Sequence, residues 1–267
     1  TLVFTDYSVP KAVGTLAIPS MLGMLINVIY NLADTFFVGQ TGDKNQVAAV
    51  SVAMPVFLFF LAVGNLFGVG GCAYISRSLG EGKKEKIKSI SSFCTYIGII
   101  VAAVLSAIFI VFKRPIFYLV GASDFTIDFA CDYMFWIALG GVFSVTSIVT
   151  CNLVRGEGAA KESMIGMVIG QVINIVLDPI FILAPGNKLF GITLPFGFNM
   201  GVKGAAIATV MGTVVALIVS MVKIFNEEYF VNARYIIKEH IRISKATCIE
   251  FYGMWKNICI ENLMTRV

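Results

Sequence analysis

The stretch that most constrains the fold of this chain runs from Ser163 to Ala184 (SMIGMVIGQVINIVLDPIFILA). It has about 22 residues and one charge, Asp178, and an apolar helix of that length can cross a bilayer. A carboxylate within a membrane helix costs about 2.5–3.5 kcal/mol on insertion scales, so it marks a functional site by default. At about 100° per residue, Gln171, Asn174 and Asp178 share one face. The stretch therefore predicts a membrane helix with a polar stripe that faces other protein.

A second apolar run, residues 13–38, has the same design. Its only charge is Asp34, and Asn27, Asn31 and Asp34 fall within an arc of about 60° on a helix. Two membrane helices that each carry one carboxylate and two carboxamides on one face predict a buried polar chamber between them.

Composition places the whole chain in the membrane. Of its residues 58% are hydrophobic and 13% are charged, whereas soluble proteins carry about 25% charged residues. We predict an all-α polytopic membrane protein, a bundle of six transmembrane helices whose sequential members are antiparallel neighbours. The predicted spans are residues 13–38, 47–76, 89–112, 129–154, 163–184 and 204–222.

The remaining composition excludes several function classes. The six cysteines form no CxxC pair and the chain has one histidine, so neither a disulfide framework nor a His-rich metal site is expected. No basic patch is interleaved with aromatic residues, so no nucleic-acid partner is expected. The pair Gly140-Gly141 in the fourth span indicates a close-packing face.

The distribution of Lys and Arg predicts the orientation. The links after the second and fourth spans and the segment after the sixth carry most of these residues, which places them, and the N-terminal end, in the cytoplasm. Both stripe-bearing spans then run outward. Asp34 lies about 6 Å short of Val38 and Asp178 about 9 Å short of Ala184, so the two carboxylates lie at similar depth.

The last part of the chain differs from the rest. Residues 1–225 form the predicted six-helix unit, and residues 226–267 a cytoplasmic connection. Basic residues in that connection recur at helical spacing between apolar ones, which predicts an amphipathic helix on the inner leaflet. These basic residues are Arg234, Lys238, Arg242 and Lys245. Gly253-Met254-x-x-Asn257 echoes Gly23-Met24-x-x-Asn27, which predicts the start of a second copy.

Three segments resemble a known family. IPSMLGMLINVIYNLADTFFVG, LVRGEGAAKESMIGM and QVINIVLDPIFI resemble the multidrug and toxic compound extrusion (MATE) transporters, closest to their DinF/MepA-like bacterial branch. The resemblance covers about residues 10–225. It implies twelve helices in two six-helix lobes, of which this chain matches the N-terminal one, so the C-terminal lobe is an expected partner. It also implies a non-enzymatic antiporter without a cofactor, which exports cationic or amphipathic drugs across the bacterial cytoplasmic membrane, driven by H⁺ or Na⁺.

The resemblance also assigns residues. Asp34 matches the family's first-helix carboxylate, and Asn174 and Asp178 match its Asn-x-x-x-Asp pair, with Na⁺ as a possible ligand of these three. Thr209 completes the expected cation or proton site, and Pro19 is the expected hinge. The expected substrate cavity network is Asn27, Asn31, Tyr133 and Gln171. Asn152 is the candidate for a fourth-helix asparagine of the family, but it lies too near the inner end of its span to reach the depth of Asp178.

Three other readings stay open. A flippase for lipid-linked precursors, from the same superfamily, would line its cavity with Arg or Lys, and no predicted span interior contains either. An intramembrane aspartyl protease would place Tyr or Gly-x-Gly before its aspartates, whereas Ala33 and Leu177 precede Asp34 and Asp178. The polar stripes would otherwise serve only to hold helices together.

The predicted orientation can be tested by labelling. In a variant without native cysteines, Ser123→Cys should react with a membrane-impermeant maleimide added to intact cells, because it lies in a predicted outer link. Glu81→Cys should react only after the cells are permeabilised. The opposite pattern would reverse the orientation and with it the assigned depth of both carboxylates.

Overall fold

A computed structural model describes residues 9–186, 188–189, 192–193 and 196–226. Six helices in this part of the chain are long and apolar enough to cross a membrane. They are α2 (Val9–Gly39), α3 (Lys44–Gly80), α4 (Lys84–Val111), α6 (Ile127–Gly156), α7 (Ala160–Ile182) and α8 (Val202–Asn226). The prediction of an all-α, multi-pass membrane protein with six spans is confirmed. The predicted inner-leaflet helix and second-copy start lie outside the described residues.

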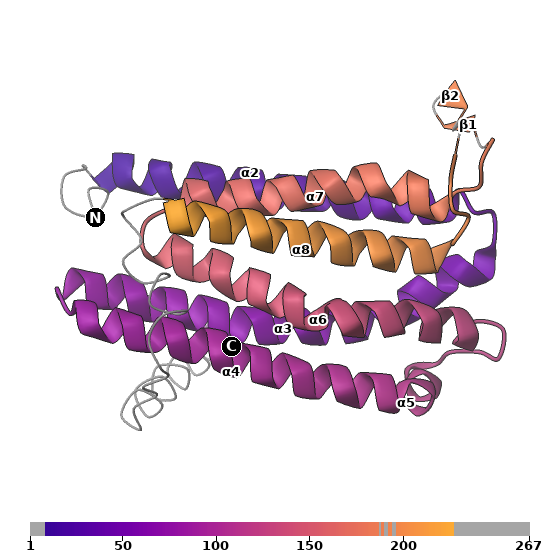
Figure 1. Cartoon of the computed structure of the whole chain (residues 1–267), viewed down its shortest axis with the longest axis horizontal. Coiled ribbons are helices and arrows are strands. Elements are labelled where there is room, and N and C mark those ends of the chain that lie inside the picture. The colour runs from indigo at the N-terminus through magenta and orange to yellow at the C-terminus, as the bar shows by residue number, and fades with distance from the viewer. Residues whose placement is uncertain (1–8, 187, 190–191, 194–195, 227–267) are drawn as a thin grey trace, which may run out of the picture.

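The long helices run along a common axis with α6 in the middle (Figure 1). Helix α6 packs against α3 and α4 on one side and against α7 and α8 on the other, while α2 packs on α7. In the described part of the chain, 67% of the most apolar 18-residue segment of α6 is buried, whereas for the corresponding segment of α2 the share is 6%. Helix α6 is therefore the core of the bundle, and α2 lies at its edge.

The position of α2 corrects one prediction. Sequential helices were expected to be neighbours, but α2 makes most of its contacts with α7 and few with α3. Small residues allow this close approach: a Cβ on Gly23 of α2 would lie 2.5 Å from the terminal methyl carbon of Met167 on α7. The polar stripes of α2 and α7 thus lie on paired helices that are far apart in sequence.

Glycines hold α6 close to its neighbours, as the sequence predicted for Gly140-Gly141. A Cβ on Gly140 would clash with Val210 of α8, and a Cβ on Gly141 would clash with the ring of Phe60 on α3. Close approach of this kind is how membrane helices gain van der Waals contact without a hydrophobic driving force between them.

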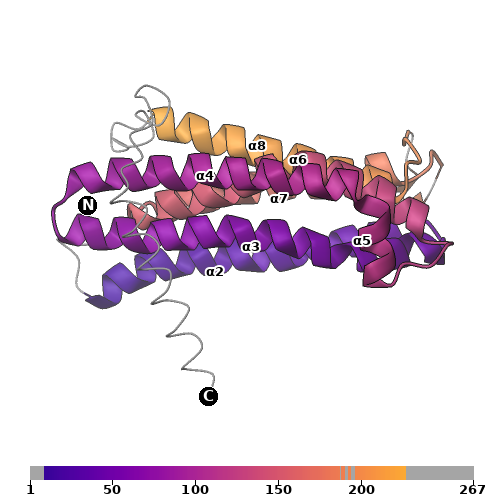
Figure 2. The ribbon, with the colours of Figure 1, turned by 90° about the horizontal axis from the view of Figure 1, so that it is seen from below.

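The links gather at two ends of the bundle (Figure 2). One end, called the outer end after the predicted orientation, carries α5 (Lys113–Val120) and the two-residue strands β1 (Lys188–Leu189) and β2 (Ile192–Thr193). The inner end carries the α3–α4 and α6–α7 links. Strands β1 and β2 pair antiparallel in the link between α7 and α8.

Helix α5 was not predicted from the sequence. It ends at Gly121, whose φ of 101° is left-handed, and the Ala122 N–H donates to the Phe117 carbonyl at 2.9 Å. This is a Schellman-type end, which favours glycine. Arg114 then reaches Asp128 at the start of α6, with 2.8 Å between Nη2 and Oδ1.

The segment that leads into α8 caps the outer end of α7. The Phe198 and Gly201 N–H groups donate to the carbonyls of Ile180 and Ile182, at 2.9 and 3.2 Å. These carbonyls have no intrahelical donor because α7 ends at Ile182. The capping fixes where α8 begins and so which residues of α8 face α7.

The close packing of α6 predicts the effect of a single methyl group. Gly141→Ala should destabilise the protein by about 1–3 kcal/mol, because the ring of Phe60 is only 1% exposed and has no room to move. The measurement is the thermal unfolding midpoint of purified protein in detergent. Gly80→Ala is the matched control, since nothing lies within 4 Å of its added Cβ. Equal midpoints for the two variants would contradict the packing account.

Candidate functional site

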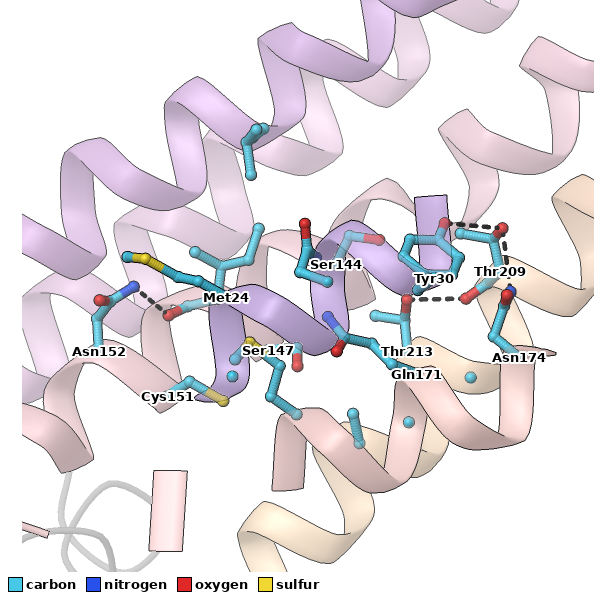
Figure 3. Close-up of a pocket in the computed structure, with 18 of the residues that line it drawn as sticks. Met24, Tyr30, Ser144, Ser147, Cys151, Asn152, Gln171, Asn174, Thr209 and Thr213 are labelled. Carbon is cyan, nitrogen blue, oxygen red and sulfur yellow. Dashed lines mark hydrogen bonds between the residues drawn. The ribbon is translucent and has the colours of Figure 1, made fainter. Parts of the chain in front are cut away.

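A cavity of about 550 Å³ lies between α2, α3, α6, α7 and α8 (Figure 3). This volume is typical of sites for small organic molecules, which are apolar with a few placed polar groups. The apolar part of its wall includes Met24, Val28, Phe57, Phe60, Leu61, Ile148 and Met167. The polar part consists mainly of amides and hydroxyls, which are spread along the cavity from Asn152 to Asn174.

At the outer end of the cavity, three side chains from three helices form a chain of hydrogen bonds. Asn174 of α7 donates through Nδ2 to Thr209 Oγ1 of α8 at 3.3 Å, and Thr209 in turn donates to the Ala205 carbonyl at 3.0 Å. The hydroxyl of Tyr30 on α2 lies 3.5 Å from Thr209 Oγ1. Thr209 thus connects α2, α7 and α8 at one point.

The close contact of α7 with α8 creates this arrangement. A Cβ on Gly212 would lie 2.7 Å from the Gly170 carbonyl oxygen and 3.0 Å from the Cβ of Asn174. Gly212 lies about one helical turn after Thr209 on α8. Only a glycine there leaves room for the Asn174 side chain of α7 beside Thr209. Because Asn174 uses its Nδ2 on Thr209, its Oδ1 is left without a hydrogen-bond partner.

The two predicted carboxylates lie beyond this end of the cavity and do not line it. Asp178 is 0% exposed, and neither of its carboxylate oxygens has a hydrogen-bond partner; Asp34 Oδ1 is in the same condition. The two aspartates are close enough to interact electrostatically with each other. Both also interact electrostatically with Tyr30 and Tyr133. Carboxylate oxygens of this kind are stable in an apolar interior when they hold a proton or a cation.

The structure separates the other predicted cavity residues. Asn27, Gln171 and Asn174 line the cavity. Asn31 is exposed on α2 and donates to the Asn27 carbonyl and side-chain oxygens at 2.8 and 3.1 Å. Tyr133 is 8% exposed in α6, near the carboxylates rather than in the cavity wall.

Pro19, the predicted hinge, is half-buried within a helix that continues through it. The single chamber expected from the two polar stripes is therefore two adjoining sites, a buried carboxylate pair and a cavity, with Asn174, Thr209 and Tyr30 between them.

The inner end of the cavity corrects a second expectation. No Arg or Lys was predicted within a span, yet Arg155 belongs to α6 and lines the cavity one turn beyond Asn152. Asn152 lies at the end opposite Asn174 and Thr209, so it is remote from the carboxylates, as its sequence position indicated (Figure 3).

Sequence reasoning missed Tyr30 and Arg155. Tyr30 falls three residues after Asn27 and four before Asp34, so the helical spacing of the α2 stripe contained the signal for it. Arg155 gave no comparable signal, because it was assigned to the link that follows the fourth span.

Taken together, the six-helix fold and the cavity between its helices define a membrane lobe of the kind found in transporters, whose binding sites form between helices. The MatE family model matches residues 19–180, which is more than half of the chain. The chain belongs to the MatE family.

Curated relatives agree with this assignment. The multidrug export protein MepA of Staphylococcus saprophyticus is 33% identical over 252 residues, which cover 93% of this chain and 52% of the relative. MepA of Staphylococcus aureus is 32% identical over 242 residues, covering 91% and 49%. The chain spans about half the length of the curated relatives it matches, and it corresponds to the N-terminal half of the family. The family consists of transporters rather than enzymes, so that prediction is confirmed.

Solved structures share the fold. An outward-facing multidrug resistance MATE transporter of the MOP superfamily matches with a TM-score of 0.76 and 29% identity, covering 90% of this chain and 50% of that one. A MOP superfamily transporter from Pyrococcus furiosus matches with a TM-score of 0.72 and 29% identity, covering 92% and 51%. That second protein is described as having a binding pocket of reversed polarity, which suggests a different function for it.

The hydrogen-bond chain predicts a difference between two threonines on α8. If the expected cation site is present, Thr209→Val should weaken cation binding there about tenfold, because it removes the hydroxyl that orients Asn174. Thr213→Val should have little effect, since that hydroxyl donates only to the Thr209 carbonyl, at 2.8 Å. Titration of the purified full-length protein with Na⁺ or with acid, followed by tryptophan fluorescence, measures both. Equal cation affinities in the two variants would exclude the orienting role.

Proposed function

We propose that this chain forms the N-terminal lobe, residues 1–225, of an antiporter that exports cationic or amphipathic organic compounds across a bacterial cytoplasmic membrane, with its N-terminal end in the cytoplasm. In this proposal a second six-helix lobe completes the transporter, and residues 226–267 connect the two. The observation that carries the proposal is the adjacency of two sites: a pair of carboxylates, three of whose four oxygens are buried without a hydrogen-bond partner, and a cavity of about 550 Å³.

The two sites share their boundary, which gives a basis for coupling. Asn174 and Thr209 line the cavity, and Asn174 lies one helical turn before Asp178 on α7. A cation that recruits Asn174 Oδ1 would pull on the Thr209 hydroxyl and, through it, on Tyr30 of α2. Binding of the cation therefore changes the wall against which the exported compound rests. The cation and the exported compound would then both act on the same group of side chains, Asn174, Thr209 and Tyr30. Coupling between two sites requires such a shared element.

The coupling cation is H⁺ or Na⁺, and no cofactor is needed. A proton would neutralise one of the two carboxylates, which interact electrostatically and are both buried. Sodium would draw on oxygen ligands from Asp34, Asp178 and Asn174, with Thr209 as a further donor of a lone pair. In either case the release of the cation on the opposite side would leave the carboxylates unpaired, which favours the return of the protein to its first state. Rocking of two lobes around a shared site then exposes the cavity to each side in turn.

A second candidate function is the flipping of lipid-linked precursors. Its sequence-based exclusion depended on the absence of Arg and Lys from the spans, and Arg155 lines the cavity. A single guanidinium at one end is less than the cluster expected for a pyrophosphate, so export of small organic compounds remains the proposal.

Neutral variants of the two carboxylates test the proposal. Asp34→Asn and Asp178→Asn should each abolish export from cells that express the full-length protein, because each removes a group that binds the cation. Both variants should still insert, since loss of a buried charge lowers the insertion cost. Export is measured as the efflux of a fluorescent dye or as drug resistance.

Asp128→Asn is the matched control for these variants. Asp128 is exposed at the outer end and pairs with the exposed Arg114, and such surface pairs contribute about 0–1 kcal/mol. Normal export by either Asp34→Asn or Asp178→Asn would remove that carboxylate from the coupling site.

A further inference from the structure

Among the described residues that line the cavity, Arg155 is the only charged one. The two acidic residues of the interior, Asp34 and Asp178, lie outside the cavity wall, near the end opposite Arg155. A molecule in the cavity therefore meets a single formal charge, which is positive, at the inner end.

The backbone around Arg155 is held firmly. Gly156 packs so closely on α3 that a Cβ there would lie 2.9 Å from the Cα and carbonyl oxygen of Cys72. Ser76 of α3 also donates to the Gly156 carbonyl at 3.0 Å. The last turn of α6 is thus clamped to α3, which limits how far the guanidinium can move toward the membrane surface.

Asn152 holds the other side of the arginine. Its Nδ2 donates to the Ile148 carbonyl at 2.9 Å, which leaves its Oδ1 to accept from Arg155 Nη1 at 3.5 Å. Gly68 of α3 makes room for this amide, because a Cβ there would lie 2.9 Å from Asn152 Nδ2. The Nε of Arg155 is buried and has no hydrogen-bond partner. A buried, unpartnered N–H of a guanidinium is an expensive feature unless something binds it.

The inner end of α3 offers a comparison. Arg77 occupies the last turn of α3, as Arg155 occupies the last turn of α6, and both precede a Gly-Glu-Gly sequence. Arg77 is exposed and does not line the cavity. A basic residue whose role is only to set the orientation in the membrane can therefore be exposed at this end, as Arg77 is. Arg155 instead lines the cavity.

We propose that Arg155, oriented by Asn152, is an oxyanion-binding subsite at the inner end of the cavity, and that it binds a carboxylate, sulfonate or phosphate group of the exported compound. This deepens the proposed function and rests on it for the identity of the ligand as an exported compound. A guanidinium offers a planar fork of N–H donors that matches such groups. The same charge disfavours compounds whose only charge is positive. The preferred substrates are thus amphipathic molecules that carry an oxyanion.

The cavity has room for the remainder of such a molecule. Ser163 of α7 lies level with Cys151 of α6, because its Oγ donates to the Cys151 carbonyl at 2.8 Å. Asn174 follows Ser163 by 11 residues, or about 16 Å along α7. That length runs from the level of Cys151, one helical turn short of Arg155, to Asn174, so an occupant bound at Arg155 extends along the cavity toward the amides beside the cation site.

Two dyes with one ring system test the subsite. Rhodamine B has a free carboxylate, and rhodamine B ethyl ester has the same aromatic cation with that carboxylate blocked. The full-length protein is purified in neutral detergent, and equilibrium affinity is measured by fluorescence anisotropy without any ion gradient. We expect the wild type to bind the free acid about tenfold more tightly than the ester.

Variants assign this preference to a residue. Arg155→Gln should bind both dyes about equally, through loss of affinity for the acid, while an affinity for the ester no lower than that of the wild type shows that the cavity is intact. Arg155→Lys should keep part of the preference, because it keeps the charge but loses the fork. Arg77→Gln is the matched control and should behave as the wild type. Equal binding of acid and ester by the wild type, or an undiminished preference in Arg155→Gln, would overturn the proposal.

A lipid headgroup has the same chemistry, and a further arm separates it from an exported compound. The affinity for rhodamine B is measured again in nanodiscs of phosphatidylcholine with and without phosphatidylglycerol. Unchanged affinity supports the substrate subsite. Competition by phosphatidylglycerol that disappears in Arg155→Gln would overturn it and assign the subsite to lipid. Because these measurements need no gradient, they stand apart from the export assays on Asp34 and Asp178.

Discussion

The burial of Asp34 and Asp178 is the constraint on which the rest of this structure depends. Carboxylates within a membrane need a partner, and the described protein supplies no hydrogen bond to three of their four oxygens. The helices nevertheless place them together: α2 leaves its neighbour in sequence and packs on α7, and α8 closes on the same point. We infer that the free energy lost in burying both charges is recovered when a cation binds.

The separation of the carboxylates from the cavity follows from the helix packing. The glycine contact between α7 and α8 brings Thr209 to Asn174 in the cavity wall, and Asp178, which does not line the cavity, lies one turn beyond Asn174. An exported compound in the cavity would not contact the carboxylates, whereas Asn174 and Thr209 border both sites. Their coupling would pass through Asn174, Thr209 and Tyr30, which contact one another across three helices.

The parts of the fold that depend on hydropathy could be predicted from the sequence, and the parts that depend on packing could not. Apolar length gave the six spans, and helical spacing gave the polar stripes around Asp34 and Asp178. The polar stripes indicated that α2 and α7 border one chamber, but the direct packing of α2 on α7 in place of α3 depends on close approach at Gly23 and Met167, which no local pattern reveals. Helix α5 was missed because it is short and its end depends on the left-handed Gly121.

The candidate site was predictable to the same extent. Asn174 and Thr209 were expected to lie together, and the structure places them in contact. Asn31 shares the predicted stripe but lies exposed, because α2 is covered on one side within the described residues. Arg155 was assigned to a link, since the clamp between Gly156 and α3 that keeps it in the bundle is a tertiary contact.

The central claim is that the carboxylate pair binds the cation whose entry drives export. The most direct measurement is transport of a fluorescent dye by the full-length protein in proteoliposomes, with an H⁺ gradient and a Na⁺ gradient imposed separately. The account predicts that one of the two gradients drives the dye against its own concentration difference and that collapse of that gradient stops it. Dye movement at the same rate with either gradient and with none would contradict it.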